Sequence, residues 1–190
     1  MPPVYSREIV YINDRLERDM AITQAEHNRM RSLGMHVVPY TIAHVGPQYA
    51  QMHSDFVTGE RLDQLPSYQR EREIGRIAAH FHRYYQDTKD RNFPYVISDI
   101  TQPFQFMHGR TFADARPTTY LIDVEPSVID VAEAMDDPEG SAALSLATEL
   151  YQLRTWAQPY WDRQGLHDFP YAIPSEQELE RLEAIDSNRY

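Results

Sequence analysis

The stretch MHVVPYTIAHVGPQYAQMHSDFVTG, residues 35–59, decides the fold class of this 190-residue chain. Residues 35–45 and 49–58 are rich in β-branched and aromatic side chains, which favour strands. Gly46 and Pro47 between them are turn-forming residues, so the two runs predict an antiparallel hairpin.

Helical patterns lie on both sides of this hairpin. Upstream, residues 4–12 predict a strand, and Asn13 or Asp14 predicts the cap of a helix that ends near Leu33, with Gly34 as its stop. After Gly59 the hydrophobic period becomes that of a helix. Further helices are predicted at 68–87, 140–156 and 175–185, and short strands at 95–100, 104–107 and 120–124. This irregular order predicts an α+β fold and not regular βαβ alternation.

The composition excludes several classes of protein. The chain has 18 basic and 29 acidic residues, a net charge of −11, which opposes a phosphate backbone, so no nucleic-acid partner is expected. It has no cysteine, which excludes disulfides, Cys-ligated zinc and thiol nucleophiles. No run approaches ~18 apolar residues and the start lacks a signal-peptide pattern, so we expect no membrane span and a cytoplasmic location.

Common catalytic motifs are missing from the sequence. The seven glycines are too dispersed for a G-x-G-x-x-G or Walker loop, and no G-x-S-x-G elbow occurs. The eight histidines have no metal-ligand spacing. Lys89 is the single lysine among the 18 basic residues, so any mechanism that requires an amine side chain must use it.

Two aspartates are the main candidates for functional residues. Asp99 follows the apolar run 95–98, and Asp123 lies within the apolar run 120–126. An aspartate at the end of a buried strand is costly unless it binds a cation, caps a turn or pairs with a base. Two such residues on short strands could hold Mg²⁺ between them, with Glu125 on the same face as Asp123.

Five segments carry a resemblance to a known family when they are taken in order. They are AEHNRMRSLGMHVVP (25–39), DFVTGERL (55–62), IGRIAAHFH (74–82), SDI (98–100) and LIDVEP (121–126). From about residue 20 to residue 130 the chain resembles the protein-kinase-like phosphotransferases, in particular the branch of aminoglycoside phosphotransferases and small-molecule kinases.

The resemblance implies a truncated kinase-like fold, with a small antiparallel sheet and a helix followed by a mainly helical lobe. Residues 1–58 would form a reduced N-terminal part and residues 59–190 a helical part, together one compact unit. It also implies six functional residues: Asp99 in catalysis, Asp123 and Gln105 as metal ligands, and Asp55, Val57 and Glu26 in cofactor binding. Mg²⁺ and ATP are the cofactors that a catalytic member would use.

The chain departs from the family pattern in the region that binds phosphate. The residues before the first helix contain no glycine and no lysine, and Arg7 is the nearest basic candidate. Phe104 stands where the family has a metal-binding Asn, which leaves Gln105 as the nearest amide.

Three functions follow as alternatives. The first is a degenerate, pseudokinase-like binding or scaffold protein with weak or no nucleotide binding, whose partner is a protein or a small molecule. The second is a reduced Mg-dependent phosphotransferase that uses Asp99 and Asp123. The third is an unrelated acidic α+β interaction domain.

Overall fold

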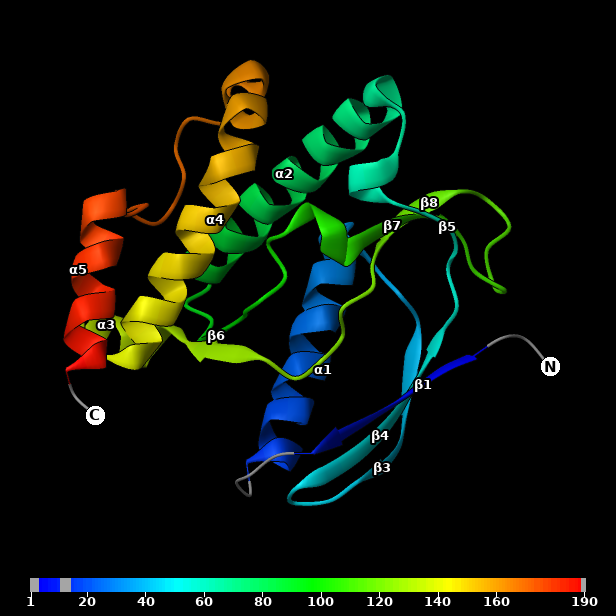
Figure 1. The fold of residues 1–190 in the computed structure, drawn as a ribbon, viewed down its shortest axis with the longest axis horizontal. Coiled ribbons are helices and arrows are strands. Elements are labelled where there is room, and N and C mark those ends of the chain that lie inside the picture. The colour runs from blue at the N-terminus through cyan, green and yellow to red at the C-terminus, as the bar shows by residue number, and fades with distance from the viewer. Residues whose placement is uncertain (1–3, 11–14, 189–190) are drawn as a thin grey trace. The chain divides into compact units, whose positions relative to one another are not determined.

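The structure is a computed structural model that describes residues 4–10 and 15–188 (Figure 1). Over these residues it is an α+β fold, as the sequence predicts, with five α-helices and three small sheets. The chain divides into two compact units: unit 1 contains the residues up to 73 and residues 103–127, and unit 2 contains residues 74–102 and 128–190. No helix in the described part of the chain has the length and hydropathy needed to cross a bilayer.

The first sheet of unit 1 contains the predicted hairpin, but its strands are shorter than the predicted 35–45 and 49–58, because residues 36–37 and 58 belong to strands of the second sheet. Its order is β1 (Val4–Val10), β4 (Tyr49–Asp55) and β3 (Tyr40–Val45), and all neighbours are antiparallel. The Gly46 amide donates to the Tyr49 carbonyl oxygen at 2.7 Å, which closes the turn. β1 is the strand predicted over residues 4–12, whereas the predicted helix cap at Asn13 or Asp14 lies outside the described residues.

Helix α1 (Leu16–Ser32) packs one face into unit 1. The buried residues of this face are Leu16, Met20, Thr23, Glu26, His27 and Met30. The helix stops at Gly34, which has a φ of 92°, a value that glycine adopts without a Cβ clash. The predicted end of this helix is therefore confirmed.

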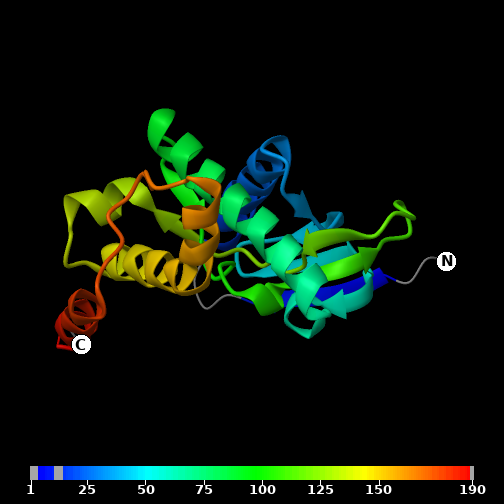
Figure 2. The ribbon, with the colours of Figure 1, turned by 90° about the horizontal axis from the view of Figure 1, so that it is seen from above.

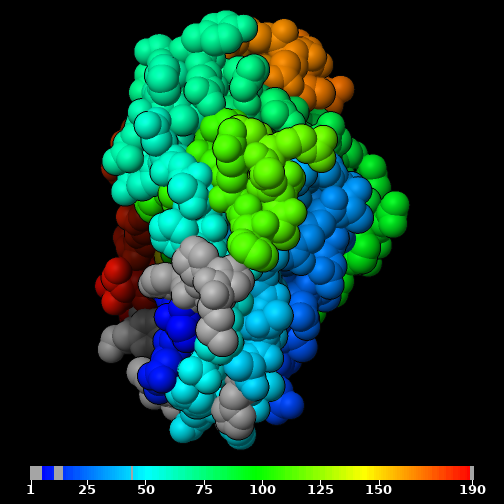
Figure 3. Space-filling view, turned by 90° about the vertical axis from the view of Figure 1, so that its right-hand side faces the viewer, coloured from blue at the N-terminus to red at the C-terminus, as the bar shows by residue number. Residues whose placement is uncertain are grey.

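The second sheet of unit 1 joins segments that are far apart in the sequence. Its order is β2 (His36–Val37), β8 (Thr118–Leu121), β7 (Phe106–Arg110) and β5 (Thr58–Arg61). Gly59 and Gly109 lie opposite each other, and a Cβ on Gly109 would come within 2.4 Å of the Thr58 carbonyl oxygen. The connection between β7 and β8 lies on the surface over residues 112–117, after the buried Thr111 (Figure 3). Two short 3-10 helices, η1 (Leu62–Gln64) and η2 (Pro103–Gln105), complete the unit.

Unit 2 is mainly helical. It contains most of α2 (Ser67–Asp90), together with α3 (Val131–Asp136), α4 (Ser141–Gln164) and α5 (Glu176–Ser187). The strands β6 (Tyr95–Ile97) and β9 (Val128–Asp130) form its two-stranded sheet. Figure 2 shows α4 beside α3 and α5.

One buried tryptophan links the two long helices of unit 2. Trp161 of α4 is 1% exposed and donates its indole N–H to the Ala78 carbonyl oxygen of α2 at 2.7 Å. Its ring stacks on Phe169 with 4.7 Å between centroids. α4 is longer than the predicted helix 140–156. It continues through Pro159 and ends at Gly165, whose φ of 71° is typical of a residue that ends a helix.

Candidate functional site

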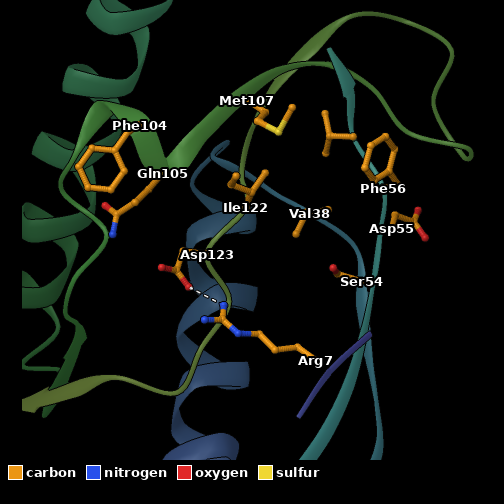
Figure 4. A pocket seen from close by; sticks show the side chains of 11 residues that line it. Arg7, Val38, Ser54, Asp55, Phe56, Phe104, Gln105, Met107, Ile122 and Asp123 are labelled. Carbon is orange, nitrogen blue, oxygen red and sulfur yellow. Dashed lines mark ion pairs between the residues drawn. The ribbon is translucent and has the colours of Figure 1, made fainter. Parts of the chain in front are cut away.

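Unit 1 contains a pocket of about 340 Å³ (Figure 4). It is formed by β1, the end of β4 and the residues after it, η2, β7, and the residues that follow β8. Val38, Val57, Met107 and Ile122 give it an apolar wall. Arg7, Asp55 and Asp123 are its charged residues. A small pocket with an apolar wall and a few charged groups is typical of small-molecule sites.

An ion-pair cluster lies at one side of this pocket. The Arg7 guanidinium lies 3.8 Å from the Asp123 carboxylate and also forms an ion pair with Glu125 (Figure 4 draws the pair with Asp123). The Asp123 side chain is 29% exposed, because β8 ends at Leu121 and Asp123 lies in the following loop. There it accepts a hydrogen bond from the Glu125 amide at 3.3 Å. The strand predicted over 120–124 therefore begins and ends earlier, at Thr118 and Leu121, so Asp123 lies outside it. Asp123 already has the Arg7 guanidinium beside it.

The structure brings four of the six predicted site residues together. Asp55, Val57, Gln105 and Asp123 all line the pocket. The backbone carbonyl oxygen of Gln105 accepts a hydrogen bond from the Ile122 amide at 3.0 Å, which joins η2 to the segment after β8. Their common location was predictable only through the family resemblance, because these residues are up to 68 positions apart (123 − 55).

Glu26 does not line this pocket. It lies in α1 and is 6% exposed. Its carboxylate forms a bidentate interaction with Arg29, with 2.6 Å between Arg29 Nη2 and Glu26 Oε2. A buried carboxylate needs such a partner, and here the partner comes from the same helix.

Two aromatic side chains of the pocket were not predicted as site residues. Phe56 is 50% exposed and Phe104 is 49% exposed, although large apolar side chains are usually buried. The Arg61 guanidinium lies 5.7 Å from the centre of the Phe104 ring. Among the described residues, no backbone hydrogen bond uses the amide of Phe56 or Val57. The sequence could have indicated Phe56, because it lies between Asp55 and Val57, which were both predicted to bind a cofactor.

Asp123 and Gln105, the two predicted metal ligands, both line this pocket. Mg²⁺ prefers near-octahedral oxygen ligands, commonly one or two carboxylates with phosphates and water. Of the two carboxylates that line the pocket, Asp55 and Asp123, the predicted metal ligand Asp123 lies beside the Arg7 guanidinium. No group of three or more His, Cys, Asp or Glu side chains suited to a metal ion occurs in the part of the chain that the structure describes.

Asp99 lies in unit 2, in a loop with an unusual backbone. It has a φ of 57°, in the left-handed region that residues with a Cβ seldom adopt. Its amide donates a hydrogen bond to the Glu149 carboxylate of α4, which has an exposed fraction of only 6%. Residues in strained conformations cluster at functional sites, where the surrounding structure holds them in place.

One face of α4 holds this loop. Besides Glu149, Gln152 accepts a hydrogen bond from the Gln102 side-chain amide at 2.9 Å, and Trp156 donates to the Thr101 carbonyl oxygen at 2.6 Å. Burial raises the pKa of Glu149 and outweighs the hydrogen bonds from the loop, which lower it. Its second oxygen, Oε2, has no hydrogen-bond partner among the described residues.

Comparison with known proteins gives no assignment for this site, since neither a protein-family model nor a curated protein matches the sequence. The geometry of the pocket and of the Asp99 loop is therefore the basis for inferring what the chain does.

Proposed function

We propose that this chain is a degenerate, kinase-like binding protein whose pocket in unit 1 takes a small ligand and has little or no affinity for magnesium–ATP. The observation that carries this proposal is the ion-pair cluster of Arg7 with Asp123 and Glu125. In kinases the corresponding groups act separately: a lysine contacts the phosphates, and an aspartate holds Mg²⁺. Here a cation and the acids neutralise one another.

The sheet of unit 1 supports the kinase-like part of the proposal. In protein kinases the phosphate-binding lysine lies on a strand near the helix that carries its glutamate partner. Arg7 lies on β1, the strand before α1, and Glu26 lies on α1. Glu26 pairs with Arg29 instead, which leaves Arg7 to pair with the acids after β8. A cation on the strand and a glutamate on the helix are therefore present, but the cation is an arginine and both have other partners.

The lining of the pocket favours a planar ligand of low charge. The apolar wall and the aromatic rings of Phe56 and Phe104 suit a flat molecule, and the amides of Phe56 and Val57 can donate to it. A triphosphate would meet Asp55 and Asp123, with Glu125 beside them, and Arg7 is the single cation among the described residues that line the pocket. Losing two or three charge-assisted phosphate contacts removes roughly 3–9 kcal/mol of binding free energy, which takes a micromolar site to millimolar or weaker.

A reduced phosphotransferase is the second candidate, and one observation favours it. The left-handed conformation of Asp99 and its hydrogen bond to Glu149 keep a carboxylate-bearing loop in a strained, fixed geometry. Such a loop suits a residue that orients a hydroxyl group for phosphoryl transfer.

Calorimetry with the purified full chain tests the proposal. Adenosine, ATP and magnesium–ATP are titrated into the wild type and into Arg7→Gln, with Arg110→Gln as the matched control, because Arg110 is an exposed arginine of unit 1 outside the pocket. We expect magnesium–ATP to bind no tighter than about 1 mM to the wild type. We also expect Mg²⁺ to bind more tightly to Arg7→Gln, because the variant releases Asp123 and Glu125.

The opposite result is equally specific. A dissociation constant below about 50 μM for magnesium–ATP, abolished by Asp123→Asn, would contradict the proposal. Transfer of phosphate to a hydroxyl acceptor that is lost in Asp99→Asn would establish the second candidate in its place.

A further inference from the structure

A separate groove lies among the helices of unit 2. We call it the α4–α5 groove; it has a volume of about 650 Å³ and is lined by the end of α2, by α3, by α4, by residues 170–174 and by α5. Of its sixteen lining residues, three carry charge: Lys89, Glu178 and Arg181. The others are apolar side chains or tyrosine. Its volume lies in the range of pockets that enclose organic ligands.

The apolar wall of the groove follows from the sequence of α4. Ala143, Leu146, Ala147 and Leu150 are spaced by three, one and three residues, which puts them on one helical face. Across the groove α5 contributes Leu182, yet no residue of α5 is buried. Leu146 and Leu150 are only 4% and 3% exposed, so the apolar surface open to the groove comes from the partly exposed Ala143, Ala147 and Leu182. The small side chains of the two alanines add to the space.

The three charged side chains at the groove differ in their partners. Arg181 forms an ion pair with Glu139. Glu178 caps its own helix: its carboxylate accepts from the Ser175 amide at 2.8 Å and from the Ser175 hydroxyl at 3.0 Å, and these bonds lower its pKa. Lys89 donates one hydrogen bond to the Pro170 carbonyl oxygen at 2.7 Å. No carboxylate of the described residues forms an ion pair with Lys89.

We propose that the α4–α5 groove binds an acyl carboxylate of medium chain length, with the alkyl chain along the wall of α4 and the carboxylate on the Lys89 ammonium. An ammonium group has three N–H donors, and one is used by Pro170, so two remain for the ligand. The bond to Pro170 holds the ammonium at the groove, and a carboxylate there gains charge-assisted hydrogen bonds. Each buried methylene of the chain adds up to about fourfold in affinity. This site is independent of the pocket in unit 1.

Calorimetry with hexanoate, octanoate, decanoate and 1-octanol tests the proposal on the full chain. We expect affinity to rise by up to about sixteenfold for each two added carbons, and octanoate to bind at least about tenfold more tightly than 1-octanol. Lys89→Gln should weaken octanoate by about tenfold and leave 1-octanol unchanged. Arg154→Gln is its control, because Arg154 is an exposed cation of α4 that does not line the groove.

A second pair of variants tests the wall. Ala147→Phe fills the groove and should abolish binding of all four probes, whereas Ser145→Phe adds the same ring at an exposed position of α4 outside the groove and should not. Absence of octanoate and decanoate binding to the wild type would overturn the proposal. Equal binding of octanoate and 1-octanol would overturn it too, as would equal losses in Lys89→Gln and Arg154→Gln. Sedimentation tests the last alternative. If the wild type is a dimer and Ala147→Phe dissociates it, the groove is an interface between copies of the chain and the proposal is overturned.

Discussion

The pocket of unit 1 and the α4–α5 groove of unit 2 are built in opposite ways. The pocket is formed by strand ends and loops, and its cation, Arg7, is paired with acids. The groove is formed by helix faces, is about twice as large, and has a cation, Lys89, with no acidic partner among the described residues. Backbone hydrogen bonds fix the distance between strands, whereas helices pack through side chains of variable size. We therefore expect unit 1 to tolerate little change and unit 2 to tolerate more.

Matched glycine substitutions should give the largest difference. In unit 1, a Cβ on Gly109 would lie 2.4 Å from the Thr58 carbonyl oxygen, so the strands β5 and β7 would have to separate. In unit 2, a Cβ on Gly165 would meet nothing within 4 Å, and only the φ of 71° opposes it. We expect Gly109→Ala to cost more than about 4 kcal/mol of unfolding free energy and Gly165→Ala about 1 kcal/mol. Urea unfolding measures both, and equal costs would contradict the comparison.

Acid should destabilise unit 1 through His27. Burial, with a smaller contribution from Arg31, lowers the pKa of His27 from 6.5 to about 3, and its Nδ1 is 3.0 Å from the Tyr40 hydroxyl. The folded state therefore binds this proton less readily than the unfolded state, so stability is complete above pH 6.5 and is lost as pH falls toward 3. We expect a loss of about 2.5 kcal/mol between pH 7 and 4.5.

Comparison with a variant isolates this contribution from other titrating groups. His27→Gln should reduce the pH dependence of the unfolding free energy, because it removes the group whose pKa burial lowers. Parallel pH curves for wild type and His27→Gln would show that His27 does not titrate in this way.

Glu149 of unit 2 should have the opposite pH dependence and a smaller effect. Its pKa is raised by burial, so the folded state binds the proton more readily than the unfolded state. The linkage therefore lowers stability as pH rises from about 4.5 toward the raised pKa. We expect Glu149→Gln to raise the melting temperature at pH 7 and to match the wild type at pH 4. A variant less stable at both pH values would make the carboxylate itself essential to the Asp99 loop.

Arg7→Gln should have the smallest effect on stability. The Arg7 side chain is 44% exposed, and its partners Asp123 and Glu125 are 29% and 42% exposed, so water and salt screen both pairs. Exposed ion pairs contribute about 0–1 kcal/mol. We expect a loss below 1 kcal/mol that disappears in 1 M salt, by urea unfolding. A larger, salt-independent loss would mean that the cluster supports the pocket structurally.

Local patterns predicted the elements that short-range chemistry determines. The hairpin followed from Gly46 and Pro47, and the last helix followed from Ser175, which with Glu178 forms a capping box. Long-range pairing was not predictable in this way. β2 has two residues and β5 has four, too short for a periodic signal, and both exist because they join one sheet with β7 and β8.

The candidate site also has a part that the sequence could predict and a part that it could not. The residue types followed from the family resemblance, and four of them line one pocket. The ion pair between Arg7 and Asp123 could not be predicted from the sequence, because the two residues are 116 positions apart (123 − 7) and no local pattern links them. Glu149 was missed for the same reason, since within a helical pattern a buried glutamate cannot be told from a solvated one.

The single lysine makes amine chemistry specific to one side chain of this protein. Reductive methylation with ¹³C-formaldehyde modifies Lys89 and the terminal α-amino group, keeps the positive charge, and adds methyl groups that give sharp NMR signals. Because Lys89 lines the α4–α5 groove, one methyl resonance can report the occupancy of this groove without any change to the sequence.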